Sequence, residues 1–153
     1  MSVAIDVTVE CDGWHRILGT ELIAHRAASA AFTSAGVEDG AASILLTSDA
    51  DIRELNKRYR NKDSATNVLS FPANGAPHLG DMVIAYETLA READAEGKKF
   101  EHHLAHLAVH GYLHLLGHDH ESDREAKKME RLEIEILARL AIPDPYAGRD
   151  LLA

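Results

Sequence analysis

The stretch that most constrains this chain runs from His110 to His120 and reads HGYLHLLGHDH. His110 and His114 are four residues apart, so on a helix their imidazoles stand one turn apart on the same face. That spacing lets two ring nitrogens reach one metal ion at about 2.0–2.1 Å each. Gly117 then stands where a left-handed residue ends a helix, so the chain can fold back and deliver His120 as a third ligand. The fold must therefore place a helix end beside a returning loop.

Three neutral imidazoles on one ion leave a fourth position for water or substrate, which is the arrangement of catalytic zinc sites. We therefore predict a hydrolytic centre with one Zn²⁺ per chain, held by His110, His114 and His120. The spacing follows the zinc-protease pattern His-Glu-x-x-His-x-x-Gly-x-x-His except at Gly111, which replaces the general-base Glu. A glycine accepts no proton, so the substrate should be one that needs no carboxylate at that point.

The neighbouring histidines need a separate interpretation. His106 lies on the same helical stripe, but it is eight residues from His114, or about 12 Å along a helix axis, too far to share one ion. We predict packing or surface roles for His102, His103 and His106, and we leave the role of His118 open.

Composition limits the class of protein. The 153 residues are 46% hydrophobic and 27% charged, which indicates a single soluble domain over 1–153 with a real core. The net charge of −9 requires any phosphate-binding surface to be a local basic patch. The single cysteine, Cys11, excludes an intramolecular disulfide. The first residues do not resemble a signal peptide and no apolar run is long enough for a membrane span, so we expect a cytoplasmic protein without membrane contact.

Hydrophobic periodicity predicts an α+β domain: a four-stranded mixed sheet packed with about five helices, with the metal site at the end of a central helix. We predict strands at 3–9, 42–47, 66–71 and 79–85, and helices at 13–35, from 48, at 87–96, from 100 and at 122–140. Pro72 should end the third strand and open a loop over 72–78, and residues 143–153 should fray.

Two capping boxes mark helix starts, Ser48 with Asp51 and Ser122 with Glu125. In the helix that Ser48 opens, the inner face should carry Ile52, Leu55 and Tyr59.

A second group of candidate residues lies in that same helix and just after it. Five basic side chains occur within ten residues: Arg53, Lys57, Arg58, Arg60 and Lys62. They form either a solvated helix face or an RNA-binding patch, since this is the densest basic stretch of an acidic chain. Arg60 is the best phosphate partner, because a guanidinium grips phosphate oxygens through two parallel hydrogen bonds.

Three signatures occur in order: LNKRYRNKDSATNVLSFP (55–72), LGDMVI (79–84) and HGYLHLLGHDH. Together they strongly resemble the bacterial YbeY family of endoribonucleases and ribosomal RNA maturation factors. The resemblance implies zinc on the three histidines, Arg60 as a functional arginine beside them, and a mixed sheet packed with helices. It also implies cleavage of single-stranded RNA, in particular of an rRNA precursor on the small ribosomal subunit, in ribosome quality control and beside ribosome-assembly proteins. This chain departs by having His118 where the family usually has Tyr, and by a short loop after Pro72.

These residues allow a mechanism. Zinc would act as a Lewis acid and acidify a water, while Arg60 neutralises charge on the phosphate. With Gly111 in the base position, either hydroxide or the neighbouring ribose hydroxyl could attack. Asp119 is placed to orient a ligand imidazole, and the resemblance alone gives Asp81 importance.

Two alternatives remain. A zinc peptidase fits the ligand spacing but lacks the Glu. A non-catalytic zinc pin in a ribosome-assembly or adaptor protein would need a fourth ligand to close the site, for which His118 is available.

Overall fold

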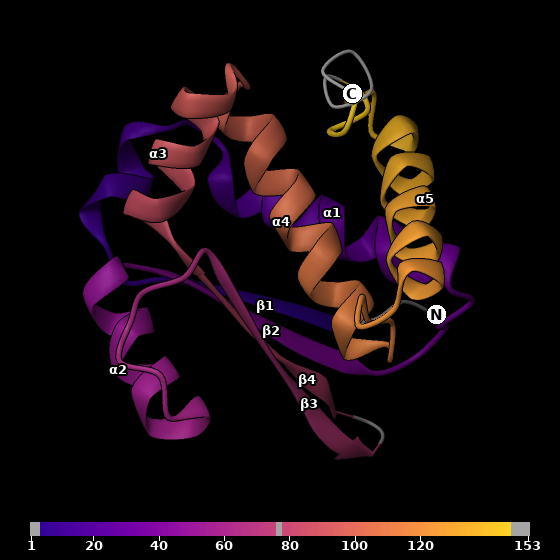
Figure 1. The fold of residues 1–153 in the computed structure, drawn as a ribbon, viewed down its shortest axis with the longest axis horizontal. Helices are drawn as coiled ribbons and strands as arrows, with labels where there is room; N and C mark the ends of the chain where they lie inside the picture. The colour runs from indigo at the N-terminus through magenta and orange to yellow at the C-terminus, as the bar shows by residue number, and fades with distance from the viewer. Residues whose placement is uncertain (1–3, 76–77, 148–153) are drawn as a thin grey trace.

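The computed structural model describes residues 4–75 and 78–147, which form a single α+β domain (Figure 1). The elements in chain order are β1 (Ala4–Val9), the 3₁₀ helix η1 (Asp12–Arg16), α1 (Thr20–Ser34), β2 (Ala41–Thr47), α2 (Asp49–Arg60), β3 (Val68–Gly75), β4 (His78–Ala85), α3 (Tyr86–Glu96), α4 (Phe100–Leu115) and α5 (Asp123–Arg139). The predicted fold class is confirmed, as are both helix starts, since Ser48 and Ser122 are N-caps whose side chains each accept a hydrogen bond from the backbone three residues on.

The four strands form one mixed sheet in the order β1-β2-β4-β3. Strands β1, β2 and β4 run parallel, and β3 pairs antiparallel with β4. The parallel pairs need crossover connections, which α1 supplies between β1 and β2. Strand β3 is therefore an edge strand, with one side of its backbone left unpaired by the sheet.

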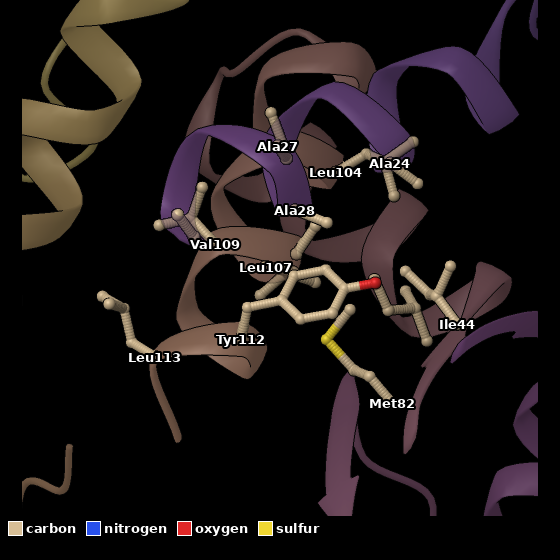
Figure 2. Close-up of a cluster of buried hydrophobic side chains, with 14 of the residues drawn as sticks. Ala24, Ala27, Ala28, Ile44, Met82, Leu104, Leu107, Val109, Tyr112 and Leu113 are labelled. Atoms are coloured by element: carbon tan, nitrogen blue, oxygen red, sulfur yellow. The ribbon is translucent and has the colours of Figure 1, made fainter. Parts of the chain in front are cut away.

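Helix α4 is the central helix. It lies across one face of the sheet beside α1 and α5, while α2 lies on the opposite face (Figure 1). Nearly every residue of α4 from His103 to Leu115 is buried. Figure 2 shows its Tyr112 between Ala24 and Ala28 of α1 and Met82 of the sheet. Because the sheet on one side and helices on the other surround α4, the direction of each of its side chains is fixed by packing.

Gly111 is where α4 comes closest to the sheet. A Cβ built there would overlap the Sδ of Met82 and lie 3.2 Å from the Oγ of Ser70. The Ser70 hydroxyl donates to the Gly111 carbonyl at 2.9 Å, which binds helix and strand at this point. Glycine at 111 therefore allows this close approach, and any larger residue would force Met82 to move.

The predicted helix over 13–35 is wrong in one respect, because it is two helices. Gly19 adopts φ +79, a left-handed conformation that favours glycine and separates η1 from α1. Trp14 of η1 is fully buried, and its indole N–H donates to the Thr47 carbonyl at 2.9 Å. Trp14 thus enters the core from η1, whereas the buried alanines enter it from α1.

Tyr59 was predicted on the inner face of α2 but is 62% exposed. The buried residues of α2 are Ile52 and Asn56, and the Asn56 amide donates to the Ser64 carbonyl at 3.0 Å. The last turn of the helix lies beside the edge strand, where Tyr59 contacts the half-buried Phe71. The sheet ends beside this last turn, so the apolar face of α2 has no strand to pack against at Tyr59.

The third strand does not stop at Pro72 but continues to Gly75, with Pro72 in register with Gly80. A proline is tolerated because β3 is an edge strand, so its missing N–H costs no ladder hydrogen bond on the outer side. The predicted loop over 72–78 shrinks accordingly, and its residues 76–77 lie outside the described part of the chain.

The predicted fraying over 143–153 is wrong for Tyr146, whose hydroxyl donates to the buried Glu133 at 2.7 Å. Residues 148–153 lie outside the described part. Within the described ranges, no helix combines the length and apolarity that crossing a bilayer requires.

We expect Gly111→Ala to destabilise the fold, because overpacking a core costs about 1–3 kcal/mol, more than the roughly 1 kcal/mol that Ala gains as a helix former. Chemical denaturation measures the change. In a Met82→Ala background the overlapping atoms are gone, so the same substitution should cost less. Equal costs in the two backgrounds would contradict the assigned contact.

Candidate metal centre

The end of α4 reverses the chain towards its own last turn. Gly117 has φ +96, the N–H of Gly117 donates to the His114 carbonyl, and the N–H of His118 donates to the Leu113 carbonyl, both at 3.0 Å. This pair of bonds is the Schellman arrangement that ends helices at a glycine. The returning segment carries His120 back to the helix, as the glycine spacing predicts.

The three imidazoles converge. The Nε2 atoms of His110 and His114 are 3.1 Å apart, and the His120 ring centroid lies 5.7 Å from that of His110 and 5.1 Å from that of His114. One nitrogen from each of the three lies within 4.8 Å of the others, which makes a group able to hold a metal ion. Among the described residues this group consists of these three side chains alone.

The hydrogen bonds of the Nδ1 atoms indicate which nitrogen of the His110 and His114 rings carries the lone pair. His114 Nδ1 lies 2.9 Å from the His118 carbonyl, which can only accept, so His114 carries its proton on Nδ1. His110 Nδ1 lies 3.3 Å from the Glu133 carboxylate and donates to it in the same way. Both Nε2 atoms then present lone pairs to each other without a proton between them.

This arrangement fits a metal ion. Two ligands at about 2.0–2.1 Å in a tetrahedral site lie about 3.3 Å apart, close to the separation of the two Nε2 atoms. Two facing lone pairs repel unless a cation lies between them, and neutral imidazole is a favoured ligand of Zn²⁺. His118, whose role was open, contributes its backbone carbonyl to the orientation of His114.

Glu133 is the functional residue that the sequence analysis missed. It comes from α5 and is only 1% exposed. Its carboxylate accepts hydrogen bonds from His106 Nε2 at 2.8 Å and from the Tyr146 hydroxyl at 2.7 Å, besides the contact with His110. The sequence pattern that could have pointed to Glu133 is a carboxylate on the apolar face of the last helix, between Met129 and Ile136.

The charge state of Glu133 follows from these contacts. Burial by itself would raise the pKa of the carboxyl, but hydrogen bonds from His106 and His110 outweigh burial and lower the pKa to about 2. The buried group is therefore an anion that holds His110 in the required tautomer and adds negative charge behind a metal ligand.

Burial also affects the histidines. It lowers the pKa of His114, and the adjacent His110 lowers it further, so the neutral, metal-binding form is favoured. Burial lowers the pKa of His103 against the opposing effect of Glu92, to which His103 Nε2 is hydrogen-bonded at 2.9 Å. His103 and His106 thus have the packing roles that the spacing argument gave them.

The histidines open onto a cavity of about 830 Å³ between the end of α4, the returning loop and the edge strand β3. Arg60 and Lys62 also line this cavity. Arg60 reaches across the edge strand, where one guanidinium nitrogen donates to the Ser70 carbonyl at 3.0 Å. The structure thus brings the predicted arginine and the predicted ligands to one cavity.

The other basic residues are placed differently. Arg53 forms an exposed ion pair with Asp63 at 2.7 Å. Lys57 and Arg58 are exposed and are not among the residues that line the cavity. The five basic residues therefore fall into two groups. Arg60 and Lys62 line the cavity, whereas Arg53, Lys57 and Arg58 are exposed to solvent away from it.

The two predicted carboxylates also differ. Asp119 lines the cavity and accepts the His120 backbone N–H at 2.8 Å, but its carboxylate is 3.9 Å from the His120 ring, so it orders the loop rather than the imidazole. Asp81 lies apart from the three histidines. It accepts from Ser43 and contacts His78, and it alternates along β4 with Met82, which faces α4. Asp81 therefore points to the opposite face of the sheet from the histidines.

Fold and geometry define a class: a small α+β domain in which three convergent histidines and basic residues line one cavity. The family model described as "Endoribonuclease YbeY" matches residues 18–141. The chain therefore belongs to the YbeY endoribonuclease family, as the three sequence signatures predicted.

Individual relatives agree. A Rhodopseudomonas palustris protein named "Endoribonuclease YbeY" is 52% identical over 155 aligned positions, covering 95% of this chain and 82% of the relative. A Bradyrhizobium protein of the same name is 52% identical over 159 positions, covering 96% and 94%. The solution structure of a Thermotoga maritima protein has a TM-score of 0.58 at 24% identity, over 90% of this chain and 91% of that one, which shows the shared fold.

We expect Glu133→Gln to weaken zinc binding by about 10–100-fold, the usual effect of losing a carboxylate behind a ligand histidine. Gln keeps the size and an acceptor oxygen but removes the charge. Competition with a chromogenic chelator measures the affinity. Glu135→Gln, on the exposed side of the same helix, is the matched control and should bind zinc as the unaltered chain does. An unchanged affinity for Glu133→Gln would contradict its role.

We expect the metal-free fold to lose stability as the pH falls below 6.5, the ordinary histidine value. His103 and His114 are protonated in the unfolded chain at a higher pH than in the folded chain, so acid favours unfolding. Denaturant midpoints of chelator-treated protein should be lower at about pH 5.5 than at about pH 7.5. His103→Gln removes one of the two groups and should reduce that difference; equal midpoints for the unaltered chain would refute the assignment.

Proposed function

We propose that this chain is a zinc-dependent endoribonuclease that cleaves single-stranded RNA. The observation that carries the proposal is the convergence of the Nε2 atoms of His110 and His114 with His120 at one end of a cavity that Arg60 also lines. Relatives that cover nearly the whole chain carry the name endoribonuclease, which supports RNA as the substrate.

Zinc is the metal that this donor set favours. Three neutral nitrogen ligands suit Zn²⁺ rather than Mg²⁺ or Ca²⁺, which prefer oxygen. The His120 side chain is 57% exposed and the cavity reaches the ligands, so the site is open in the manner of catalytic zinc sites. When bound, Zn²⁺ would supply Lewis acidity towards a phosphodiester oxygen and make a water more acidic.

The protein's own residues position the phosphate. The Ser70 carbonyl holds one nitrogen of Arg60, which fixes the guanidinium against the edge strand and leaves its other donors for phosphate oxygens. An arginine fixed in this way stabilises charge that develops on the phosphate at no cost of reorganisation. Lys62 adds a second cation at the same cavity.

Gly111 leaves the position that holds the glutamate in zinc peptidases without a carboxylate. Any side chain at 111 would begin with a Cβ that overlaps Met82. The proton of the nucleophile must therefore leave by another route, whether the nucleophile is water or the neighbouring ribose hydroxyl. The same packing weighs against a zinc peptidase, which needs the glutamate at that position.

We further propose the biological setting that the family resemblance implies: maturation of an rRNA precursor on the small ribosomal subunit and ribosome quality control, in the cytoplasm and beside ribosome-assembly proteins. A purely structural zinc pin is less well supported, because structural sites are normally closed by a fourth ligand.

We expect His114→Ala to lose both zinc and RNA cleavage, and Arg60→Ala to retain zinc while cleavage falls by about 10²–10³-fold, the usual effect of losing one charge-stabilising group. Elemental analysis and cleavage of a labelled single-stranded RNA measure the two properties. Arg139→Ala, an exposed arginine at the end of α5, is the matched control and should cleave normally.

Normal cleavage by Arg60→Ala would refute the assigned role. Product end groups separate the two routes, because a 2′,3′-cyclic phosphate is formed only when the ribose hydroxyl attacks. A parallel incubation with an unstructured protein, with and without chelator, tests the peptidase alternative.

A further inference from the structure

Tyr59 is an exposed aromatic residue beside the proposed RNA site. Among the described residues, the exposed large hydrophobic side chains are Leu18, Leu22 and Tyr59. Of these, Tyr59 is the one whose neighbour in the chain, Arg60, lines the cavity with the histidines. The Tyr59 ring is 62% exposed, so most of its surface is available to a ligand.

The ring is held from one side. Tyr59 and Phe71 make an edge-to-face contact, with centroids 5.6 Å apart and planes at 67°. Phe71 is anchored in the edge strand β3 and packs on the smaller core cluster with Ile52 and Val83. An aromatic side chain has few rotatable bonds, so this single contact orients Tyr59 while leaving most of its surface open to solvent.

Phe71 also connects Tyr59 to Arg60. The Arg60 guanidinium lies 5.8 Å from the Phe71 ring centroid, and its hydrogen bond to Ser70 places it at the edge strand. Tyr59, Phe71 and Arg60 thus form one cluster at the edge of the sheet, which we name the edge cluster. Its cation lines the cavity, and the exposed ring and the cation both contact Phe71.

The charge around the edge cluster suits a polyanion. The protein carries a net charge of −9, yet the last turn of α2 carries Lys57, Arg58 and Arg60, and Lys62 follows. An exposed aromatic ring among cations is the combination by which proteins hold single-stranded nucleic acid, since cations take the phosphates and the ring stacks on a base. A docking protein would not need this local reversal of charge.

We propose that Tyr59 is a base-stacking residue, which positions a nucleotide of single-stranded RNA beside the phosphate held by Arg60. This inference rests on the proposed function, because it takes RNA as the ligand of the cavity. Stacking would select unpaired RNA, since bases inside a duplex have no free face to offer. Stacking would also add affinity for RNA, which the overall negative charge of the protein disfavours.

The test compares two probes with the full, zinc-loaded chain: a single-stranded RNA oligonucleotide carrying one 2-aminopurine, and inorganic polyphosphate, which has charge but no bases. Tyr59→Ala should bind the RNA about 5- to 150-fold more weakly, the range for loss of one stacked base. Its affinity for polyphosphate should be unchanged. Quenching of 2-aminopurine on binding should be lost in Tyr59→Ala and kept in Tyr59→Phe.

Cleavage kinetics give an independent measure. Loss of a contact made equally before and during reaction raises KM and leaves kcat nearly unchanged, which is the expected result for Tyr59→Ala. Leu18→Ala, which removes another exposed hydrophobic side chain, is the matched control and should behave as the unaltered chain. A melting temperature within a few degrees of the unaltered value shows that Tyr59→Ala is folded.

Equal RNA binding by Tyr59→Ala and the unaltered chain would overturn the stacking role. Equal weakening for RNA and polyphosphate would overturn it as well, because the ring would then act through Arg60 and not on a base. If the unaltered chain binds RNA with quenching but does not cleave it, the stacking role stands and the proposed nuclease activity fails.

Discussion

The contact between Gly111 and Met82 is the constraint on which the rest of this structure depends. It brings α4 so close to the sheet that no Cβ fits between them. With that face of the helix fixed, His110 lies about 100° and His114 about 60° around the axis from Gly111, both on the same side. One close approach therefore positions the central helix, points two imidazoles at the cavity, and removes the carboxylate that a peptidase would place there.

The site is completed by segments that are distant in the chain. Glu133 of α5 and the carbonyl of His118 hold the outer nitrogens of His110 and His114. Arg60 comes from the opposite face of the sheet and reaches the cavity over the edge strand. An edge strand is needed for this, because in an interior strand the Ser70 carbonyl would face a neighbouring strand. The antiparallel addition of β3 to an otherwise parallel sheet is thus what lets α2 contribute to a site built on α4.

Local sequence patterns predicted correctly those features that are set by interactions between residues close together in the chain. The N-caps at Ser48 and Ser122 depend on bonds within one turn, and the His110, His114 and Gly117 spacing depends on helix geometry and one glycine. The failures occur where a neighbour far along the chain decides. Pro72 stays in its strand because that strand lies at an edge, and Tyr59 leaves the core because the sheet ends beneath it.

The sequence by itself determined the three-histidine group, the helix that carries it and the family to which the chain belongs, because ligand spacing and family signatures are local patterns. Only the tertiary structure decided that Glu133 lies behind the candidate ligand His110, that Gly111 is where α4 comes close to Met82, and that Arg60 and Tyr59 both contact Phe71. The physical reason is that hydrogen bonds within a turn involve residues three to five positions apart, whereas burial and charge pairing depend on segments that only folding brings together.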